Sequence, residues 1–208
     1  MTQERLLHSA IEHFGLCGFE GASTREIARD SGTAMSSITY HFGGKQGLYL
    51  AAADHIAANV KAMHGAYLDE IRARRPFSAD VATGIVADSI ERFARMMVTA
   101  EVEPWSRFII REQMDPTEAF NRLFDGFMSD VVELLVELVG TVRPDWSGPV
   151  TRAAAMLMLG QAIVLRAGRA SLCRVMQIDR LDPAMNEFLI DQLKANVRAI
   201  LARPGVPS

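Results

Sequence analysis

The segment Ser36–Lys45, with the sequence SSITYHFGGK, carries more hydrogen-bonding side chains than a short packed helix needs. Its hydroxyl groups can each donate and accept hydrogen bonds, which suits contact with a polar partner. A glycine pair and a lysine follow directly, and exposed backbone amides beside a cation favour an anion such as a phosphate. The segment therefore predicts a binding surface rather than a core element.

Other titratable side chains do not form a catalytic or metal-binding constellation. His8 and Glu12 share one face of an expected helix, and His55 and His64 are nine positions apart without a third ligand at metal-binding spacing. Glu112 lacks a base partner, and no phosphate loop or nucleophile elbow occurs. We therefore expect no enzyme, no bound metal and no cofactor.

Length and composition are those of a soluble globular protein. The chain has 208 residues, of which 49% are apolar and 23% charged, with a net charge of −3. Cys17 and Cys173 are too few for a disulfide framework, and the first residues show no export signal, so we expect a cytoplasmic protein. The most apolar run, Ala153–Leu165, is too short to span a bilayer and contains Gln161, so no membrane partner is expected.

Apolar residues recur at helical spacing along nearly the whole chain, which predicts an all-α fold of about nine helices. Capping signals mark several starts, with Ser23 and Glu26 forming one capping box, Asp115 opening a second, and Asp182 preceding a proline. The expected helices cover about residues 2–17, 24–31, 35–42, 45–74, 79–100, 104–114, 116–142, 150–167 and 183–203.

The second and third expected helices are short and joined by a tight turn at Gly32, which is the pattern of a helix-turn-helix. In such modules the second helix enters the major groove of DNA, where hydroxyl groups reach base edges and ring-bearing side chains reach phosphates. Ile38 and Phe42 are expected to point inward. The expected DNA-contacting residues, including those at neighbouring helix starts, are Thr24, Arg25, Ser36, Ser37, Thr39, Tyr40, His41 and Lys45.

The stretches ASTREIARDSG and SSITYHFGGKQGLYLAA resemble the DNA-binding domain of the TetR/AcrR family of transcriptional regulators. The resemblance covers about the first fifty residues and places the same eight residues at positions that commonly touch DNA. It implies a DNA-binding domain at residues 1–48 and an effector-binding and dimerisation domain at residues 49–208. Two later stretches, WSRFIIREQMDPTEAF and LGQAIVLRAG, resemble the CecR/YbiH branch, whose members are linked to drug sensitivity and efflux.

Two features of the N-terminal segment depart from that pattern. Ala34 stands where the third helix needs a capping side chain, and alanine cannot supply one. The first fifty residues contain four basic and five acidic side chains, so the segment has no basic surplus. Because the salt dependence of DNA binding follows the number of neutralised phosphates, we expect a modest dependence.

The larger part of the chain is rich in methionine and phenylalanine, which suits an apolar effector pocket but also an ordinary helical core. Polar residues inside apolar helices are further candidates for effector contacts. The residues expected to bind effector are Met97, Trp105, Phe108, Arg111, Phe124, Met128, Gln161 and Arg166. The last two expected helices, the final one with an apolar stripe at Met185, Leu189, Leu193, Val197 and Ile200, predict a homodimer interface.

These observations predict a DNA-binding transcriptional regulator, a repressor released from a near-palindromic operator by a small, largely apolar effector. Two alternatives stay open at the level of the sequence. Cys173 lies beside Arg174, which can lower the pKa of a thiol, so the regulator could sense oxidation instead. The N-terminal helices could also bind protein in an effector-blind adaptor.

Overall fold

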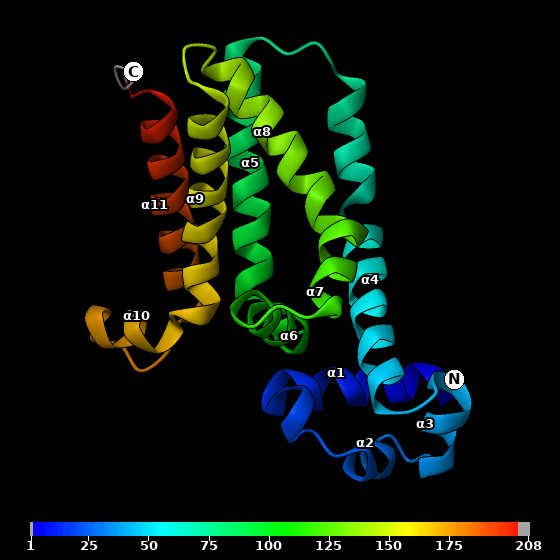
Figure 1. Ribbon diagram of the computed structural model, residues 1–208. Helices are drawn as coiled ribbons and strands as arrows, with labels where there is room; N and C mark the ends of the chain where they lie inside the picture. Colours follow the sequence, from blue (N-terminus) through cyan, green and yellow to red (C-terminus); the bar gives the residue numbers. More distant parts are fainter. Residues whose placement is uncertain (1, 204–208) are drawn as a thin grey trace. The chain divides into compact units, whose positions relative to one another are not determined.

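The computed structural model describes residues 2–203, in which every regular element is helical and no strand occurs (Figure 1). This confirms the predicted all-α fold. The elements are α1 (Thr2–Gly21), α2 (Thr24–Asp30), α3 (Met35–Phe42), α4 (Lys45–Ala73), α5 (Ala79–Val98), α6 (Glu103–Met114), α7 (Glu118–Leu123), the π-helix η1 (Phe124–Met128), α8 (Ser129–Val142), α9 (Gly148–Ala167), α10 (Arg169–Met176) and α11 (Pro183–Leu201).

Two of the three predicted helix caps are present. The Ser23 hydroxyl accepts a hydrogen bond of 3.4 Å from the backbone amide of Glu26 at the start of α2. The Asp182 carboxylate accepts one of 2.8 Å from the amide of Met185 at the start of α11. Each side chain satisfies a backbone donor that the first helical turn leaves unpaired, so both helices begin where the sequence predicts.

The third predicted cap was wrong. Asp115 closes α6, because its backbone amide donates to the carbonyl of Arg111, and Thr117 caps α7 by accepting a hydrogen bond of 3.1 Å from Ala119. At the break between α6 and α7, Asp115 therefore ends the first helix and Thr117 begins the second. From α7 the chain continues without interruption through η1 into α8.

The helix α10 was not predicted, so residues 2–203 hold ten separate helices rather than about nine. It follows α9 after Gly168 alone and ends at Gln177, whose backbone is left-handed with φ of 56°. A segment of eight residues spans little more than two helical turns, which is too short for periodicity to distinguish it from the end of α9.

The chain divides into two compact units, and both draw on separate stretches of sequence. Unit 1 comprises Met1–Ala66 and Glu101–Ser129, and unit 2 comprises Tyr67–Ala100 and Asp130–Ser208. The first division lies within α4, inside the helix where a boundary was expected. The functional division at residues 1–48 and 49–208 stays a prediction, since the compact units follow packing rather than function.

The core of unit 1 extends beyond the three N-terminal helices. Leu6, Ile11 and Phe14 of α1 pack with residues of α2, α3 and the first half of α4. Phe108 of α6 and Leu123 of α7 belong to the same buried cluster. Two helices that come much later in the sequence, α6 and α7, therefore pack against the N-terminal helices and share their core.

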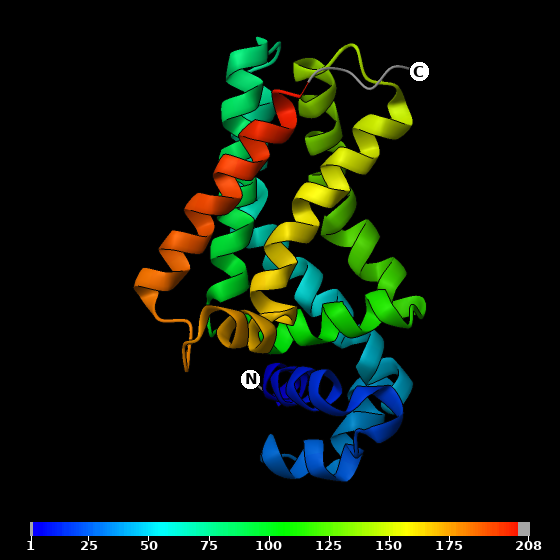
Figure 2. The same ribbon diagram turned by 90° about the vertical axis from the view of Figure 1, so that its left-hand side faces the viewer.

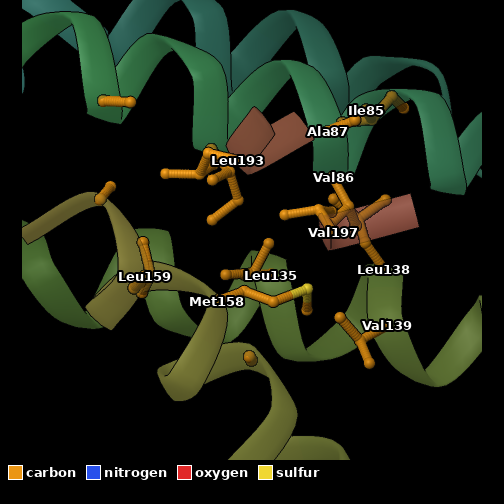
Figure 3. Close-up of a cluster of buried hydrophobic side chains, with 14 of the residues drawn as sticks. Ile85, Val86, Ala87, Leu135, Leu138, Val139, Met158, Leu159, Leu193 and Val197 are labelled. Atoms are coloured by element: carbon orange, nitrogen blue, oxygen red, sulfur yellow. The ribbon is translucent and has the colours of Figure 1, made fainter. Parts of the chain in front are cut away.

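The core of unit 2 lies between α5, α8, α9 and α11, and its buried side chains are apolar (Figure 3). Leu193 and Val197 of α11 are part of this core, where they lie near Val86 and Met158. The apolar stripe that we assigned to a dimer interface therefore faces inward at these two positions. Burial in the monomer's own core accounts for its periodicity.

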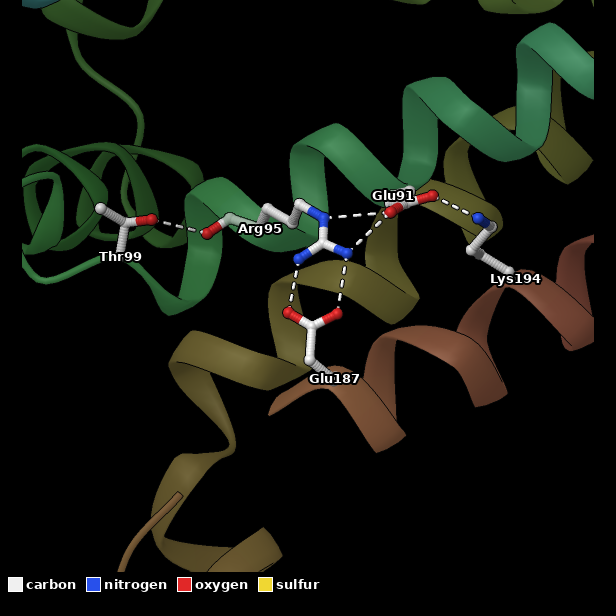
Figure 4. A network of polar contacts seen from close by, with 5 residues as sticks. All are labelled: Glu91, Arg95, Thr99, Glu187 and Lys194. Carbon is white, nitrogen blue, oxygen red and sulfur yellow. Dashed lines mark hydrogen bonds and ion pairs between the residues drawn. The ribbon is translucent and has the colours of Figure 1, made fainter. Parts of the chain in front are cut away.

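A network of charged side chains joins α5 to α11 at the surface of unit 2 (Figure 4). The Arg95 guanidinium donates to both carboxylate oxygens of Glu187, at 2.6 and 2.8 Å, and to Glu91. Lys194 also forms an ion pair with Glu91. The hydrogen bond from Lys194 is the main reason that the pKa of Glu91 lies below its ordinary value.

The helix α9 is longer than the apolar run predicted from the sequence. By length and composition alone its 20 residues could cross a membrane, and a third of that apolar stretch, 33%, is buried inside the protein. Ala155, Met158 and Ala162 form the buried side and pack into the unit 2 core. Core helices of globular proteins pass the same test of length and hydropathy.

Candidate nucleic-acid interface

The turn between α2 and α3 is fixed by backbone geometry. Gly32 has φ of 62°, a conformation that side-chain-bearing residues rarely adopt. Its amide donates to the carbonyl of Arg29, and the amide of Thr33 donates to the carbonyl of Ala28 at 2.9 Å. These two bonds close α2 in the manner of a left-handed helix cap, and they set the direction in which α3 begins.

Side chains of α1 donate hydrogen bonds to this turn and to α2. The Arg5 guanidinium donates to the carbonyl oxygens of Ser31 and, at 3.1 Å, Gly32. The buried Ser9 hydroxyl donates to the carbonyl of Ile27 at 3.2 Å. Carbonyls at the C-terminal end of a helix lack partners within it, so α1 both satisfies them and positions the turn.

The helix α3 anchors itself through one buried residue and exposes the others. Ile38 lies in the unit 1 core with 2% of its surface exposed, whereas Tyr40 is 82% exposed. Ser36 and Thr39 are exposed as well, while Ser37 is half-buried. The predicted contact surface is therefore accessible, and an exposed aromatic ring on it has no role in packing the core.

The start and end of α3 differ in how they are capped. Ala34 occupies the cap position without a side-chain hydrogen bond, as the sequence predicts. At the other end Gly43 and Gly44 have φ of 73° and 116°, so the chain reverses there into α4. A Cβ placed on Gly47 would lie 1.7 Å from the carbonyl oxygen of Phe42, which leaves space for glycine alone.

Most basic side chains of the N-terminal segment already have partners within the protein. Arg29 donates to Asp30 at 2.8 Å, and His13 contacts the other oxygen of the same carboxylate at 2.9 Å. The hydrogen bond from Arg29 is the main cause of the lowered pKa of Asp30. Lys45 donates to the carbonyl of Glu20 at 3.2 Å, which occupies one of its three donors.

Arg25 is different, since within residues 2–203 no hydrogen bond or ion pair of its side chain is present. It is exposed at the start of α2, next to the half-buried Thr24. Its guanidinium is therefore free to contact a phosphate. His41 is half-buried and contacts the Gln3 amide at 3.2 Å.

The residues predicted to bind effector are divided between the two units. Phe108 is buried in the unit 1 core with its ring centroid 4.8 Å from that of Tyr49, and Arg111 donates to the carbonyl of Leu16. The members in unit 1 are Trp105, Phe108, Arg111, Phe124 and Met128, and those in unit 2 are Met97, Gln161 and Arg166. Their part in effector binding stays a prediction.

In unit 2, the polar candidates are engaged within the protein. The Gln161 side-chain oxygen accepts a hydrogen bond of 3.3 Å from Asn196 of α11, and the Arg166 guanidinium donates to the carbonyl of Thr99 at 2.5 Å. Met97 is buried in the unit 2 core. Within residues 2–203 no group of three or more His, Cys, Asp or Glu side chains is placed to hold a metal ion.

The sequence presented Glu112 only as a carboxylate without a base partner. It is 1% exposed, and its carboxylate accepts a hydrogen bond of 2.5 Å from the hydroxyl of Tyr49. Burial, followed by this hydrogen bond, raises the pKa of Tyr49 well above its ordinary value. Only tertiary packing brings the two residues together, because 63 positions separate them.

A second surface of interest lies on α9 and α11, which run side by side in unit 2 (Figures 1 and 2). Leu157 is 69% exposed and Phe188 is 48% exposed. They belong to two helical stripes that contain no charged residue, namely Ala153, Leu157, Gly160 and Val164 on α9, and Phe188, Gln192, Ala195 and Ala199 on α11. A Cβ on Gly160 would meet nothing within 4 Å, so this surface is open.

Comparison with known proteins identifies relatives of both parts of the chain. Residues 6–52 match the family of bacterial regulatory proteins named tetR, and residues 83–203 match the C-terminal domain of the HTH-type transcriptional dual regulator CecR. The chain is 24% identical to CecR of Shigella flexneri, over 96% of this chain and 91% of that protein. It is 28% identical to the regulatory protein RaaS of Mycobacterium tuberculosis, over 75% of this chain and 66% of that protein.

Solved structures share the fold at low sequence identity. A TetR-family regulator from Mesorhizobium loti has a TM-score of 0.63 at 16% identity, over 97% of this chain and 95% of that one. The regulator FadR from Bacillus subtilis, solved with stearoyl-CoA, has a TM-score of 0.60 at 13% identity, over 95% of this chain and 96% of that one. These similarities extend over nearly the full length.

Proposed function

Because the chain belongs to the TetR-type transcriptional regulators with a CecR-type C-terminal domain, and so is a DNA-binding regulator and not an enzyme, we propose that it is a repressor released by a small molecule. In this proposal a homodimer covers a near-palindromic operator. A largely apolar effector then favours a conformation that no longer fits the operator. The effector must bind that conformation more tightly than the DNA-bound one, or no release follows.

The observation that carries the proposal is the exposed face of α3. Ile38 ties the helix to the core, while Ser36, Thr39 and Tyr40 lie exposed on a helix of the family's DNA-binding domain. Hydroxyl groups can bond to base edges and phosphates in the major groove, and Arg25 supplies an unpaired cation one helix earlier. Contacts by Ser37, His41, Thr24 and Lys45 complete the proposed interface.

The dimer follows from the uncharged stripes of α9 and α11. A surface with Leu157 and Phe188 exposed is costly in water, and a second copy of the same surface would cover it with matching chemistry. Two recognition helices in such a dimer must lie about 34 Å apart to meet successive major grooves. This requirement accounts for the proposed two-fold operator. A regulator of chromosomal DNA works where the chromosome lies, so we place the protein in the cytoplasm.

The proposal of an apolar effector rests on a similar protein and on the composition of the helices. A similar protein, FadR of Bacillus subtilis, was solved with stearoyl-CoA, and CecR-type relatives share the C-terminal domain. The methionine- and phenylalanine-rich helices of this chain are compatible with an apolar ligand. Trp105, Phe124 and Met128 are the apolar candidates that the structure leaves partly exposed.

The proposal is tested by electrophoretic mobility shift with DNA fragments from upstream of the protein's own gene. We expect one fragment to shift at nanomolar protein, and the shift to be lost when an effector from a library of apolar small molecules is added. A protein that shifts no upstream fragment would contradict the repressor. A shift that survives every compound would favour a regulator that does not respond to such ligands.

A further inference from the structure

Glu112 is an ionisable side chain in the core of unit 1, and within residues 2–203 its hydrogen bonds come from uncharged donors alone. Burying a carboxylate is unfavourable unless its oxygens are well bonded. An apolar residue of the same size would fill the space at lower cost. The charge must therefore be explained by the geometry that its bonds impose.

The two oxygens of Glu112 bond to two different helices. Oε1 accepts from the Tyr49 hydroxyl of α4 at 2.5 Å. Oε2 accepts from the backbone amide and the hydroxyl of Thr117, at 3.1 and 2.8 Å, directly before α7. Since Glu112 itself lies on α6, one carboxylate joins α4, α6 and the start of α7.

Tyr49 carries this arrangement to the N-terminal helices. Its ring meets the rings of Phe14 and Phe19 edge-on, with centroid distances of 4.7 and 5.1 Å. It also lies one helical turn after Lys45, the first residue of α4, which follows α3 across the glycine pair. The position of Tyr49 thus fixes the start of α4 relative to α1, and with it the end of α3.

Contacts farther along α4 are less specific. Arg122 of α7 donates to Asp54 at 2.6 Å, but both side chains are partly exposed, where ion pairs contribute little. Ala57 and Gly126 touch closely, since a Cβ on Gly126 would lie 2.7 Å from that of Ala57. These contacts fix the spacing of the helices, whereas a buried hydrogen bond to a charged acceptor also selects one rotation of α4.

We propose that Glu112 is a positioning residue for DNA recognition, which acts through Tyr49 to hold α3 and α4 in the arrangement that binds the operator. This inference rests on the proposed operator binding by α3. It assigns to α6 a role in recognition without contact to DNA. In the absence of the hydrogen bond, the apolar contacts of Tyr49 keep unit 1 folded but allow α4 to rotate.

The test compares Tyr49→Phe, Glu112→Gln and the double variant with the wild type. Tyr67→Phe is the matched control, because the Tyr67 hydroxyl bonds to Ser89 at 3.2 Å within unit 2. Operator affinity is measured by fluorescence anisotropy with the fragment that the wild type binds. Amide hydrogen exchange of α3 is measured in the same proteins without DNA.

We expect each single variant to bind the operator about tenfold more weakly, as for the loss of one hydrogen bond to a charged group. The double variant should lose less than the sum of the two single losses, since both changes weaken the same interaction. Exchange in α3 should accelerate in all three variants, while the control matches the wild type in both measurements.

The proposal is overturned if folded Tyr49→Phe and Glu112→Gln proteins keep wild-type affinity and wild-type exchange in α3. It is equally overturned if α3 exchange and affinity change as much in the Tyr67→Phe control. A wild-type protein without any operator would contradict the proposed function instead. The exchange measurement needs no DNA, so it still tests the positioning of α3 in that case.

Discussion

Unit 1 and unit 2 are both helical, but they place their hydrogen-bonded polar groups differently. Unit 1 buries Glu112, Ser9 and Ser31 in or beside its core and bonds each of them. Unit 2 buries Arg143 and Thr151 with hydrogen bonds at helix ends, beside an apolar core, and its charged network between α5 and α11 lies at the surface. Buried hydrogen bonds have strict geometry, whereas apolar packing tolerates small shifts.

The outer surfaces of the two units also differ in the kind of side chain that they expose. Unit 1 exposes hydroxyls and a tyrosine on α3, and unit 2 exposes uncharged stripes on α9 and α11. A unit that must place a recognition helix therefore gains from directional bonds inside, and a unit that associates with a copy of itself gains from apolar area outside. The predictions below test this contrast, beginning with the largest effect.

Gly47→Ala should disrupt unit 1 more than any other single change. The new Cβ would meet the Phe42 carbonyl oxygen at 1.7 Å, and backbone atoms at the α3–α4 junction cannot move aside without breaking the turn. We expect the free energy of unfolding to fall by more than about 3 kcal/mol, and operator binding to be lost. Thermal unfolding followed by circular dichroism measures the first effect.

Gly65→Ala is the matched control on the same helix, because a Cβ there meets nothing within 4 Å. Alanine favours a helix over glycine by about 1 kcal/mol, so this variant should be slightly more stable than the wild type. Equal destabilisation by the two substitutions would show that the close approach at Gly47 does not constrain unit 1.

Leu157→Glu should separate the dimer while leaving each monomer folded. The side chain is 69% exposed in the single chain, so the charge costs little there, but it would be buried without a partner in the proposed interface. We expect the dimer dissociation constant to rise at least about 100-fold, as for the central residue of an interface. Sedimentation velocity at micromolar concentration measures it.

Leu16→Glu provides the control, since Leu16 is 59% exposed on α1 and is not a member of the uncharged stripes. It should remain a dimer. If Leu157→Glu sediments as the wild type does, α9 does not form the interface, and the exposed apolar area of unit 2 needs another explanation.

Tyr40→Ala should weaken operator binding about tenfold without a change in stability, because the ring is 82% exposed and packs against no core residue. Arg25→Ala should weaken it as well, but with a different signature. Removing one phosphate contact lowers the slope of log affinity against log salt by about 1, whereas removing Tyr40 leaves the slope nearly unchanged. Lys61→Ala serves as the surface control and should match the wild type.

Glu91→Gln should have the smallest effect, limited to unit 2 and dependent on pH. The folded pKa of Glu91 is lowered from 4.5, chiefly by the hydrogen bond from Lys194. The carboxylate therefore stabilises the fold above its unfolded pKa, and this contribution disappears as pH falls through the folded pKa. The wild type should lose part of its stability between about pH 5 and 3, and the variant should show a flatter profile.

Denaturant unfolding at a series of pH values measures this effect. Glu137→Gln removes an exposed glutamate that pairs with Arg75, and it should leave the profile closer to that of the wild type. An unchanged pH profile in Glu91→Gln would show that the α5–α11 network does not contribute to stability.

Local signals in the sequence predicted much of unit 1. The extent of α3, the cap at Ser23, the missing cap at Ala34 and the turn at Gly32 all depend on residues within a few positions of one another. The same is true of the all-α fold, which follows from helical periodicity. Local sequence thus predicted the helices of the recognition module but not what holds them together.

Features that depend on tertiary contacts were not predictable. The sequence placed Leu193 and Val197 on a dimer surface, because periodicity marks an apolar face without telling which partner covers it. It named Lys45 as a DNA contact without revealing that its ammonium also donates to the carbonyl of Glu20, 25 positions earlier. The pairing of residues far apart in the chain decides both questions.

The central claim is that α3 of two copies reads two half-sites on one operator. It is tested most directly by comparing the affinity of the wild type for its operator with that for the same fragment after one half-site is scrambled. We expect nanomolar affinity for the intact operator and a loss of at least about 100-fold for the scrambled one, since one of two recognition helices loses its base contacts. Equal affinity for the two fragments would contradict the account.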